Sequence, residues 1–525
     1  MHIGIALGTE RRGGPSGIVG PALYFSATGS DASNGLTPAT AKQTIAHLNT
    51  LTVASGTTVA FKGGDTFAGQ VEVQNGVNYT SYGTGKAIIS VPDVSFGSAF
   101  HGYGKGTSNN TFSYLKISGP GYANLNQTAG FDFGEDTTVR TQTDITVSNC
   151  EITGVNTAIG FGNDIASNWN RLTFQNNYIH DCRGGGIGNY SFNSASLGLI
   201  WAQFLNVVIR NNVVTNCGAD GIVWAGCTGA LIENNVVSNC GAITAGKVGI
   251  WLYDAYQSTI QYCESYNNTS GGADGGGFDL DQNTQQCTIQ YCYSHGNKGP
   301  GYMIYAQVGK GADTCGNNTV RFCISENDAS NSTGYGSLFV ASNGTSMLQN
   351  YIYGNTIYQS QAGCHAVQID TNAKGIFANN IFMTNNATAN LYKSGATRNA
   401  SAVFKGNDWY GAAGTNFIYN ATNYGSLALL QAADTTFEKP SGTNIGLTVD
   451  PLLTTPGSGG TLCSSGTSIP PVITNANLTA YKLQAGSTLR GAGRDIASEN
   501  SISQGSLDYF GNTLALPNSV GAHDF

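Results

Sequence analysis

A short internal repeat along the middle of this chain constrains its fold more than any other feature. Seven segments align without gaps, and a looser eighth copy, GIFANNIFMTNN, begins at Gly375. The closely matched copies start roughly 23–35 residues apart, which is the spacing of proteins that stack one structural unit on the next. The seven are ITVSNCEITGVN from Ile145, LTFQNNYIHDC from Leu172, VVIRNNVVTNC from Val207, ALIENNVVSNC from Ala230, STIQYCESYNN from Ser258, CTIQYCYSHGN from Cys287 and NTVRFCISEND from Asn318.

Within each copy, apolar and polar residues alternate with a period of two. This period indicates a strand with one buried face, because a helix would repeat its apolar positions every 3.6 residues. One strand cannot bury its own apolar face, so the copies must stack. The apolar position holds Phe174, Ile209, Ile232, Ile260, Ile289 and Val320, and the polar position after it holds Gln175, Arg210, Glu233, Gln261, Gln290 and Arg321.

Two further columns of equivalent residues predict how the coils are held together. One contains Asn177, Asn212 and Asn235, then Cys263, Cys292 and Cys323; the other contains Cys182, Cys217 and Cys240. Stacked strands lie about 4.8 Å apart, so Asn side chains can hydrogen-bond from coil to coil, and a small apolar Cys fills the same space. We therefore expect most of the 12 cysteines to be reduced and packed rather than disulfide-bonded.

Each copy is followed by a second strand that begins at a glycine. These segments are Gly185–Tyr190, Asp220–Ala225, Val248–Asp254, Gly276–Gln282, Pro300–Ala306 and Tyr335–Ala341. Aligned on the glycine, they place Ile222, Trp224, Ile250, Leu252, Phe278, Leu280, Tyr302 and Ile304 inward. Two strands per coil, with a third in the remaining length, predict an all-β parallel β-helix.

Both ends of the chain add a family resemblance. YFSATGSDASNGLTPATAKQTIAHLN followed by GTTVAFKGGDTFAG resembles the entry module of pectate-lyase-like β-helix proteins of bacteria and phages, and Leu483–Ile496 and Asp508–Phe525 resemble that group's closing motif. The resemblance implies a right-handed parallel β-helix. We expect a short capping helix with Ala41, Ile45 and Leu48 on one side, and a loop-rich C-terminal wrap over the last coils.

The first residues have a resemblance of their own. The Gly- and Ile-rich start with its Arg-Arg-Gly-Gly stretch resembles the start of some phage tail proteins. The expected organisation is a lead at 1–22 for virion attachment, a cap at 23–60, the β-helix at 61–426 and the wrap at 427–525. The start lacks the pattern of a secretory signal, so either a signal was removed or the protein leaves its cell without one.

Composition excludes two classes of function. The net charge is −8 and no basic run occurs, so the sequence predicts no nucleic-acid binding. No apolar stretch approaches the roughly 18 residues of a membrane span, so it predicts no membrane insertion.

The best candidate for chemistry lies on the outer side of the second strands. Two outward columns hold Val223, Trp251, Asp279 and Met303, and Ala225, Tyr253, Asp281 and Tyr305. Sugars stack on exposed aromatic rings, while carboxylates accept hydrogen bonds from their hydroxyls. Asp279 and Asp281 have Cα atoms about 6.5–7 Å apart on a strand, which suits the acid and the base or nucleophile of a glycosidase. Asp254, one coil away, is a third candidate, and a solvated strand edge is the plain alternative.

Two other groups of residues could bind a glycan. Lys298 could act with Asp274, Asp279 and Asp281 in a lyase reaction, but we favour an inter-coil ladder of charge pairs through Arg183, Asp220, Lys247, Asp274 and Lys298. Glu264 and His295 form a possible acid/base pair on the outer side of the repeat. The sequence predicts no metal site and no cofactor, with Ca²⁺ weakly indicated by Asp274–Asp281.

From these features and the resemblance we expect a phage tailspike-like or tail-fibre-like protein. It would bind host surface polysaccharide and depolymerise it, more by hydrolysis than by a lyase reaction. The resemblance further implies a homotrimer in the virion that contacts other tail proteins through its N-terminus. The alternatives are a non-catalytic receptor-binding or structural virion protein, and a secreted polysaccharide lyase.

Overall fold

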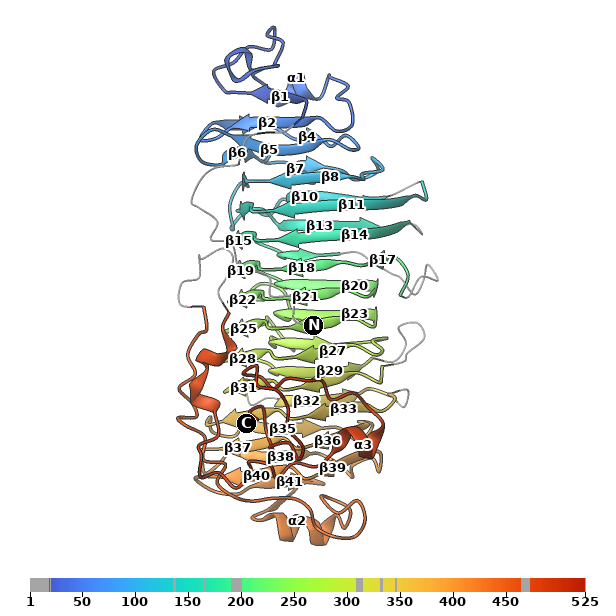
Figure 1. Ribbon diagram of the computed structural model, residues 1–525, viewed down its shortest axis with the longest axis vertical. Coiled ribbons are helices and arrows are strands. Elements are labelled where there is room, and N and C mark those ends of the chain that lie inside the picture. The colour runs from blue at the N-terminus through green and yellow to red at the C-terminus, as the bar shows by residue number, and fades with distance from the viewer. Residues whose placement is uncertain are drawn as a thin grey trace.

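A computed structural model describes residues 18, 20–135, 138–163, 167–189, 201–307, 315–330, 334–344, 347–463 and 473–524. These residues form an elongated column of coils, with the N-terminal cap at one end and α2 at the other (Figure 1). Each coil contributes one strand to each of three parallel stacks. For example, β20 is followed by β21 and β22, and the next coil begins with β23.

The first stack carries the first half of each sequence repeat. Its strands are β1 (Ala22–Phe25), β2 (Thr58–Lys62), β5 (Asn78–Tyr82), β8 (Asn110–Ser113), β11 (Thr141–Ser148), β14 (Asn168–Gln175), β18 (Val208–Arg210), β21 (Leu231–Glu233), β24 (Thr259–Gln261), β27 (Thr288–Gln290), β30 (Thr319–Arg321), β33 (Asn350–Tyr353), β36 (Gly375–Ala378) and β39 (Ala402–Lys405).

The second stack is a 13-stranded sheet that carries the second half of each repeat. Its strands are β3 (Thr66–Ala68), β6 (Ala87–Ser90), β9 (Leu115–Ser118), β12 (Glu151–Thr153), β15 (Tyr178–His180), β19 (Val213–Thr215), β22 (Val236–Ser238), β25 (Glu264–Tyr266), β28 (Tyr293–His295), β31 (Ile324–Glu326), β34 (Thr356–Gln359), β37 (Ile381–Thr384) and β40 (Asp408–Gly411).

The third stack carries the glycine-led strands of the sequence together with others that no glycine leads, such as those that begin at His365 and Asn390. Its strands are β4 (Val71–Glu72), β7 (Ser98–His101), β10 (Ala129–Glu135), β13 (Thr157–Asn163), β16 (Ile187–Gly188), β20 (Ile222–Thr228), β23 (Ile250–Tyr256), β26 (Phe278–Leu280), β29 (Tyr302–Ala306), β32 (Gly336–Ser342), β35 (His365–Ile369), β38 (Asn390–Ser394) and β41 (Phe417–Tyr419). The short β17 (Phe204–Leu205) pairs with β14 and β20, and β42 (Thr422–Tyr424) is antiparallel to β41.

The expectation of one strand per repeat copy was wrong. Each copy contains two strands in different stacks, joined by a residue in the left-handed conformation, such as Asn211 (φ 57°) or Tyr262 (φ 52°). This residue turns the chain, so the third strand of each coil comes from inside the repeat and not from the remaining length.

The Asn column forms the expected ladder at this turn. Asn177 Nδ2 donates to Asn212 Oδ1 at 3.0 Å, and Asn212 Nδ2 donates to Asn235 Oδ1 at 2.9 Å. Downstream, a second ladder ends on a buried carboxylate, because Asn407 Nδ2 donates to Glu438 Oε1 at 2.7 Å. A carboxylate suits this end because it only accepts, and the last amide still has N–H groups to donate.

The predicted core is confirmed. The eight inward residues of the third stack are all fully buried, and all 12 cysteines are free and buried. The solenoid therefore has a continuous apolar interior closed without disulfide bonds.

Capping elements close both ends, as expected. Ala41, Ile45 and Leu48 are buried beneath the first coils, although the helix α1 spans only Ile45–Leu48 and follows the 3-10 turn η1 (Pro38–Thr40). At the other end, α2 (Leu427–Ala433) buries Leu427 and Leu430.

The C-terminal segment runs back along the outer side of the second stack (red in Figure 1). It contains η2 (Asn475–Asn477), η3 (Thr479–Tyr481) and α3 (Ile496–Asn500). Its apolar side chains pack on outward residues of β28, β31, β34 and β37. Among the described residues, no helix is long and apolar enough to cross a membrane.

Candidate active site

The outer side of the third stack carries the residues singled out in the sequence. The strands pair so that Trp251 lies beside Asp279, and Asp279 lies beside Met303. Tyr305 of the neighbouring column lies beside Ala341. The predicted order of these outward columns is therefore confirmed by the register of the strands.

A hollow of about 520 Å³ opens on this side, where the small side chain of Ala341 follows the large one of Tyr305. We call it the acidic hollow, because three of its lining residues are aspartates. It is lined by Ala273, Asp274, Asp281, Met303, Tyr305, Gln307, Tyr335, Phe339, Ala341, Ser342, Asn343 and Asp370. None of these lining residues is a lysine or an arginine.

Asp281 follows the end of β26 and faces the acidic hollow from a half-buried position. Burial raises the pKa of this carboxyl to about 7, against an ordinary value of 3.8, and the charges of Asp274 and Asp254 act in the same direction. The backbone N–H of Gln282 donates to Asp281 Oδ1 at 2.7 Å and partly opposes the rise. Asp281 can therefore keep a proton near neutral pH, as a general acid requires.

The other two carboxylates of the acidic hollow have hydrogen-bonded oxygens. Tyr335 Oη donates to Asp274 Oδ1 at 3.2 Å. The backbone N–H groups of Ser342 and Asn372 donate to the two oxygens of Asp370, at 2.8 and 2.9 Å. Burial raises the pKa of Asp370, but these two donors favour its charged form.

Asp281 and Asp370 follow strands β26 and β35, which are three rungs or about 14 Å apart along the stack.

Asp279 was expected to be exposed, and this expectation was wrong. Its side chain faces outward but is only 1% exposed, between Trp251 and Met303. Burial raises the pKa of Asp279 well above its ordinary range, and the neighbouring charges of Asp281 and Asp274 add to this rise. No donor among the described residues reaches its Oδ1. Asp279 therefore lies beside the acidic hollow and does not line it.

The predicted aromatic residues and Asp254 differ in whether they line the acidic hollow. Tyr305 lines the acidic hollow, whereas Trp251 and Tyr253 stack on each other next to it, with ring centroids 5.0 Å apart. The Trp251 indole N–H donates to the buried Asp220 at 2.9 Å, which fixes the ring. Asp254 is buried with φ 47° and accepts a hydrogen bond from Asn283 Nδ2 at 2.7 Å, so it contacts the next coil and not the hollow.

Lys298 forms no ion pair, among the described residues, with the aspartates that were expected to act with it. Its ammonium donates to the carbonyl of Ser270 at 2.8 Å. Within the described part of the chain, the one ion pair of the expected charge ladder joins Asp220 and Lys247, at 3.0 Å, and Asp274 bonds Tyr335 instead.

Glu264 and His295 do form a pair, with His295 Nε2 3.1 Å from Glu264 Oε1. The expectation that they face solvent was wrong, because the C-terminal segment covers them. Glu264 is fully buried, and the backbone N–H groups of Leu462 and Cys463 donate to its two oxygens, at 2.8 and 3.2 Å.

Asp370 and Tyr335 line the acidic hollow but were missed in the sequence. The segment HAVQID (His365–Asp370) has no glycine at its start, so it was not aligned with the other strands of the third stack. Val367 pairs with Leu338, and this register places Asp370 in the column of Asp281 and Tyr305. An alignment on the apolar positions alone would have found it.

Metal binding has no support from side-chain grouping. Within the described part of the chain, no three His, Cys, Asp or Glu side chains are placed to hold a metal ion.

Comparison with known proteins identifies the fold. Residues 187–321 match the family model described as the right-handed β-helix region. The chain is a right-handed parallel β-helix. No curated protein sequence matches it significantly.

Several solved structures share this β-helix. The GH136 lacto-N-biosidase from Eubacterium ramulus is 18% identical (TM-score 0.52), and the match covers 65% of this chain and 64% of that one. The A-module of the mannuronan C-5 epimerase AlgE4 from Azotobacter vinelandii is 17% identical (TM-score 0.50; 67% and 91% covered). XylC in complex with xylose is 14% identical (TM-score 0.53; 96% and 98% covered). The chain thus spans about two thirds of the lacto-N-biosidase, and these similarities establish the fold.

Proposed function

We propose that this β-helix is a glycoside hydrolase that cleaves a polysaccharide in the acidic hollow. The observation that carries the proposal is Asp281, a carboxyl with a pKa of about 7 on the wall of an open hollow that two tyrosines also line. A glycosidase needs one carboxyl that stays protonated and one that is ionised. Asp281 fits the first role, and Asp274, which lines the same hollow and whose charge acts on Asp281, fits the second. Asp370 lies about 14 Å from Asp281 along the stack, beyond the roughly 5–9.5 Å between the two carboxyl groups of a glycosidase.

The proposed step uses these two groups on opposite sides of the bond. Asp281 gives its proton to the glycosidic oxygen as the bond to the anomeric carbon breaks. Asp274 takes a proton from the water that attacks this carbon, so both products leave as neutral sugars. The rings of Tyr305 and Tyr335 offer apolar faces to the sugar, and Asp370 accepts hydrogen bonds from hydroxyls further along the glycan.

The charge of the acidic hollow favours a neutral glycan and hydrolysis over a lyase reaction. A lyase acts on a uronate and needs a cation to neutralise its carboxylate. The lining residues include three aspartates and no lysine or arginine, so a uronate would be repelled there. The names of the similar structures, a lacto-N-biosidase and a complex with xylose among them, are consistent with glycans as the ligand class.

The test is the release of reducing ends from a panel of neutral and acidic polysaccharides. We expect Asp281→Asn and Asp274→Asn to lower kcat by about 10²–10⁴-fold. The rate should also fall above about pH 7, as Asp281 loses its proton. Asp144→Asn, which makes the same change at an exposed carboxylate paired with Arg171, should keep full activity. Glycan binding without new reducing ends, or an unsaturated uronate in the product, would contradict the proposal.

We also propose the biological role and the assembly that the sequence predicts. They are a tailspike role on host surface polysaccharide, a homotrimer, and attachment to the virion through residues 1–22, most of which lie outside the described residues. Sedimentation at three times the chain mass of 54.6 kDa would support the trimer, and binding of the chain to tail proteins through its N-terminus would support attachment.

A further inference from the structure

A second hollow lies on the same side of the β-helix, nearer the N-terminus. The outward column that contains Trp251 and Asp279 runs back through Val223, Gly188 and Gly160 to Asp132. Asp132 is five rungs before Asp279, or about 24 Å at the spacing of stacked strands. Both hollows therefore open on the third stack.

This second hollow has a volume of about 190 Å³ and exists because side chains are missing from its floor. Gly160 occupies the outward position where the neighbouring coil has Asp132, and Gly162 follows two residues later. We call it the aromatic hollow, after Phe96 at its edge. It is lined by Phe96, Gln127, Thr128, Ala129, Asp132, Asn156, Thr157, Gly160, Phe161 and Gly162.

Phe96 is the most unusual residue of the aromatic hollow. Its side chain is 74% exposed, and its backbone has φ 64°, a left-handed conformation that is rare for a bulky residue. Such conformations cost about 1–3 kcal/mol and cluster at binding sites. The backbone N–H of Phe96 donates to the carbonyl of Gln127 at 2.9 Å, which ties its loop to the next coil. The fold therefore holds an apolar ring in solvent, in a conformation that does nothing for the core.

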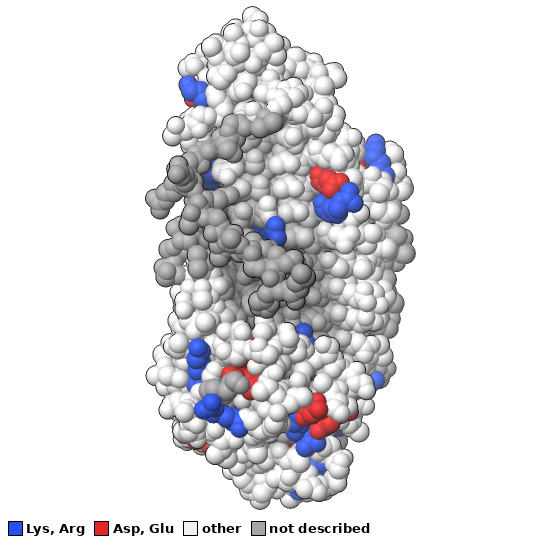
Figure 2. All heavy atoms as spheres, viewed as in Figure 1, with Lys and Arg blue, Asp and Glu red and all other residues white. Residues whose placement is uncertain are grey.

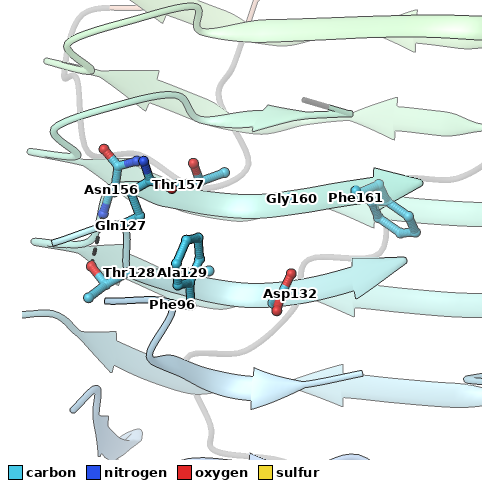
Figure 3. A pocket seen from close by; sticks show the side chains of 10 residues that line it. Phe96, Gln127, Thr128, Ala129, Asp132, Asn156, Thr157, Gly160 and Phe161 are labelled. Atoms are coloured by element: carbon cyan, nitrogen blue, oxygen red, sulfur yellow. Dashed lines mark hydrogen bonds between the residues drawn. The ribbon is translucent and has the colours of Figure 1, made fainter. Parts of the chain in front are cut away.

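Polar side chains stand around this ring. Figure 3 shows the ring of Phe96 beside Ala129, with Gln127, Thr128 and Asn156 on one side and Asp132 on the other. Asp132 Oδ2 lies 3.1 Å from His101 Nδ1, which orients the carboxylate. An exposed ring next to amide, hydroxyl and carboxylate groups is the combination that binds a sugar, since the ring covers the apolar face and the polar groups bond its hydroxyls.

We propose that the aromatic hollow is a second carbohydrate-binding subsite, which takes one neutral sugar unit of a glycan against Phe96. This subsite shares only its ligand class with the proposed hydrolase site, because no residue lines both hollows. It would hold a polysaccharide on the same side of the molecule as the acidic hollow without taking part in the chemistry.

Two variants test the aromatic hollow in different ways. Phe96→Asn removes the ring, and Asn readily adopts the left-handed conformation, so the fold should be kept or slightly stabilised. Gly160→Leu places a side chain in the hollow; the first atom that its Cβ meets is the Thr157 methyl group, at 3.1 Å. Leu125→Ala is the matched control, because Leu125 is 77% exposed but does not line the hollow.

The experiment is binding of the full chain to an array of neutral, acidic and amino-sugar glycans, in an Asp281→Asn background that prevents turnover. We expect the background protein to bind at least one neutral glycan. Phe96→Asn should weaken this binding by about 3- to 10-fold, and Gly160→Leu by at least as much, while Leu125→Ala leaves it unchanged.

Two results would overturn the subsite. One is that the background protein binds no glycan; the other is that the Phe96→Asn and Gly160→Leu variants bind glycan as tightly as the background protein does. Thermal unfolding checks that each variant folds. Phe96-dependent binding with no release of reducing ends by the wild type would retain the subsite and reject the hydrolase. Release of reducing ends by the wild type, with glycan binding that does not depend on Phe96, would retain the hydrolase and reject the subsite.

Discussion

At the scale of single residues, the raised pKa of Asp281 links the proposed chemistry to stability. Between about pH 4 and pH 7 the folded protein keeps a proton on this carboxyl that the unfolded chain has already lost. The free energy of unfolding therefore falls as the pH rises through this window, because the folded state disfavours the charged carboxylate. Below pH 4 the carboxyl is protonated in both states, and this contribution is constant.

We therefore expect Asp281→Asn to stabilise the protein at pH 8 and to change little at pH 4. The gain should be up to about 2 kcal/mol, since the side chain is half-buried and solvent screens part of the cost. Urea unfolding of the wild type and the variant at pH 4, 6 and 8 measures the difference. A difference that does not vary with pH would show that the carboxyl titrates normally in the fold.

The residues of the site differ in how well the sequence could place them. The outward orientation of Asp281 and Tyr305 was predicted correctly, because inward and outward positions alternate strictly along a strand. The burial of Asp279 was not predictable in this way, because alternation gives the direction of a side chain and not what covers it. Met303, its neighbour in the next coil, packs with Phe339 and Ala341 in a small cluster outside the main core.

At the scale of the elements, the turn between the first and second stacks explains why two strands were taken for one. The left-handed position at this turn is an Asn in several coils, a residue that often adopts this conformation. In three consecutive coils it is Tyr262, Tyr291 and Phe322, which gave no local signal of a turn. Tyr262 and Tyr291 stack at 5.0 Å, and this contact offsets part of the strain.

The Asn ladder beside this turn should make a large contribution to stability. Asn212 is fully buried; its Nδ2 donates to Phe174 O and Asn235 Oδ1, and its Oδ1 accepts from the backbone and side chain of Asn177. Asn212→Ala leaves these partners unpaired, so we expect a loss of about 3–5 kcal/mol. Asn212→Cys should cost less, because Cys263 fills the same place two coils later and accepts from Asn235. Urea unfolding measures both.

Arg210→Ala is the control for the ladder, because Arg210 is exposed and bonds only Gln175 among the described contacts. It should change the free energy of unfolding by no more than about 0.5 kcal/mol. Equal losses in Asn212→Ala and Arg210→Ala would mean that the amide ladder adds nothing beyond surface contacts.

At the scale of the whole molecule, the outer sides of the three stacks differ in what covers them. The C-terminal segment covers the second stack from β25 to β37. The first stack carries polar side chains that bond one another from coil to coil, such as Gln290 with Gln261 and Arg321. Both hollows open on the third stack. The face seen in Figure 2 carries few charged side chains; its acidic groups lie close to basic ones, and several basic groups stand apart. The third stack is therefore the side on which both proposed binding sites lie.

The division also gives Glu264 a structural role that can be tested against the sugar-binding role expected from the sequence. Glu264 is fully buried, and its carboxylate holds His295 and two backbone N–H groups of a segment almost 200 residues later in the chain. Glu264→Ala leaves these donors unpaired, so we expect the free energy of unfolding to fall by about 2–5 kcal/mol and the C-terminal segment to be proteolysed faster.

Glu233→Ala, the control at a half-buried position of the first stack, should have little effect on the free energy of unfolding or on proteolysis. Glycan binding should be unchanged in both variants, because Glu264 lines neither hollow. Weakened glycan binding with full stability in Glu264→Ala would instead favour the sugar-binding role.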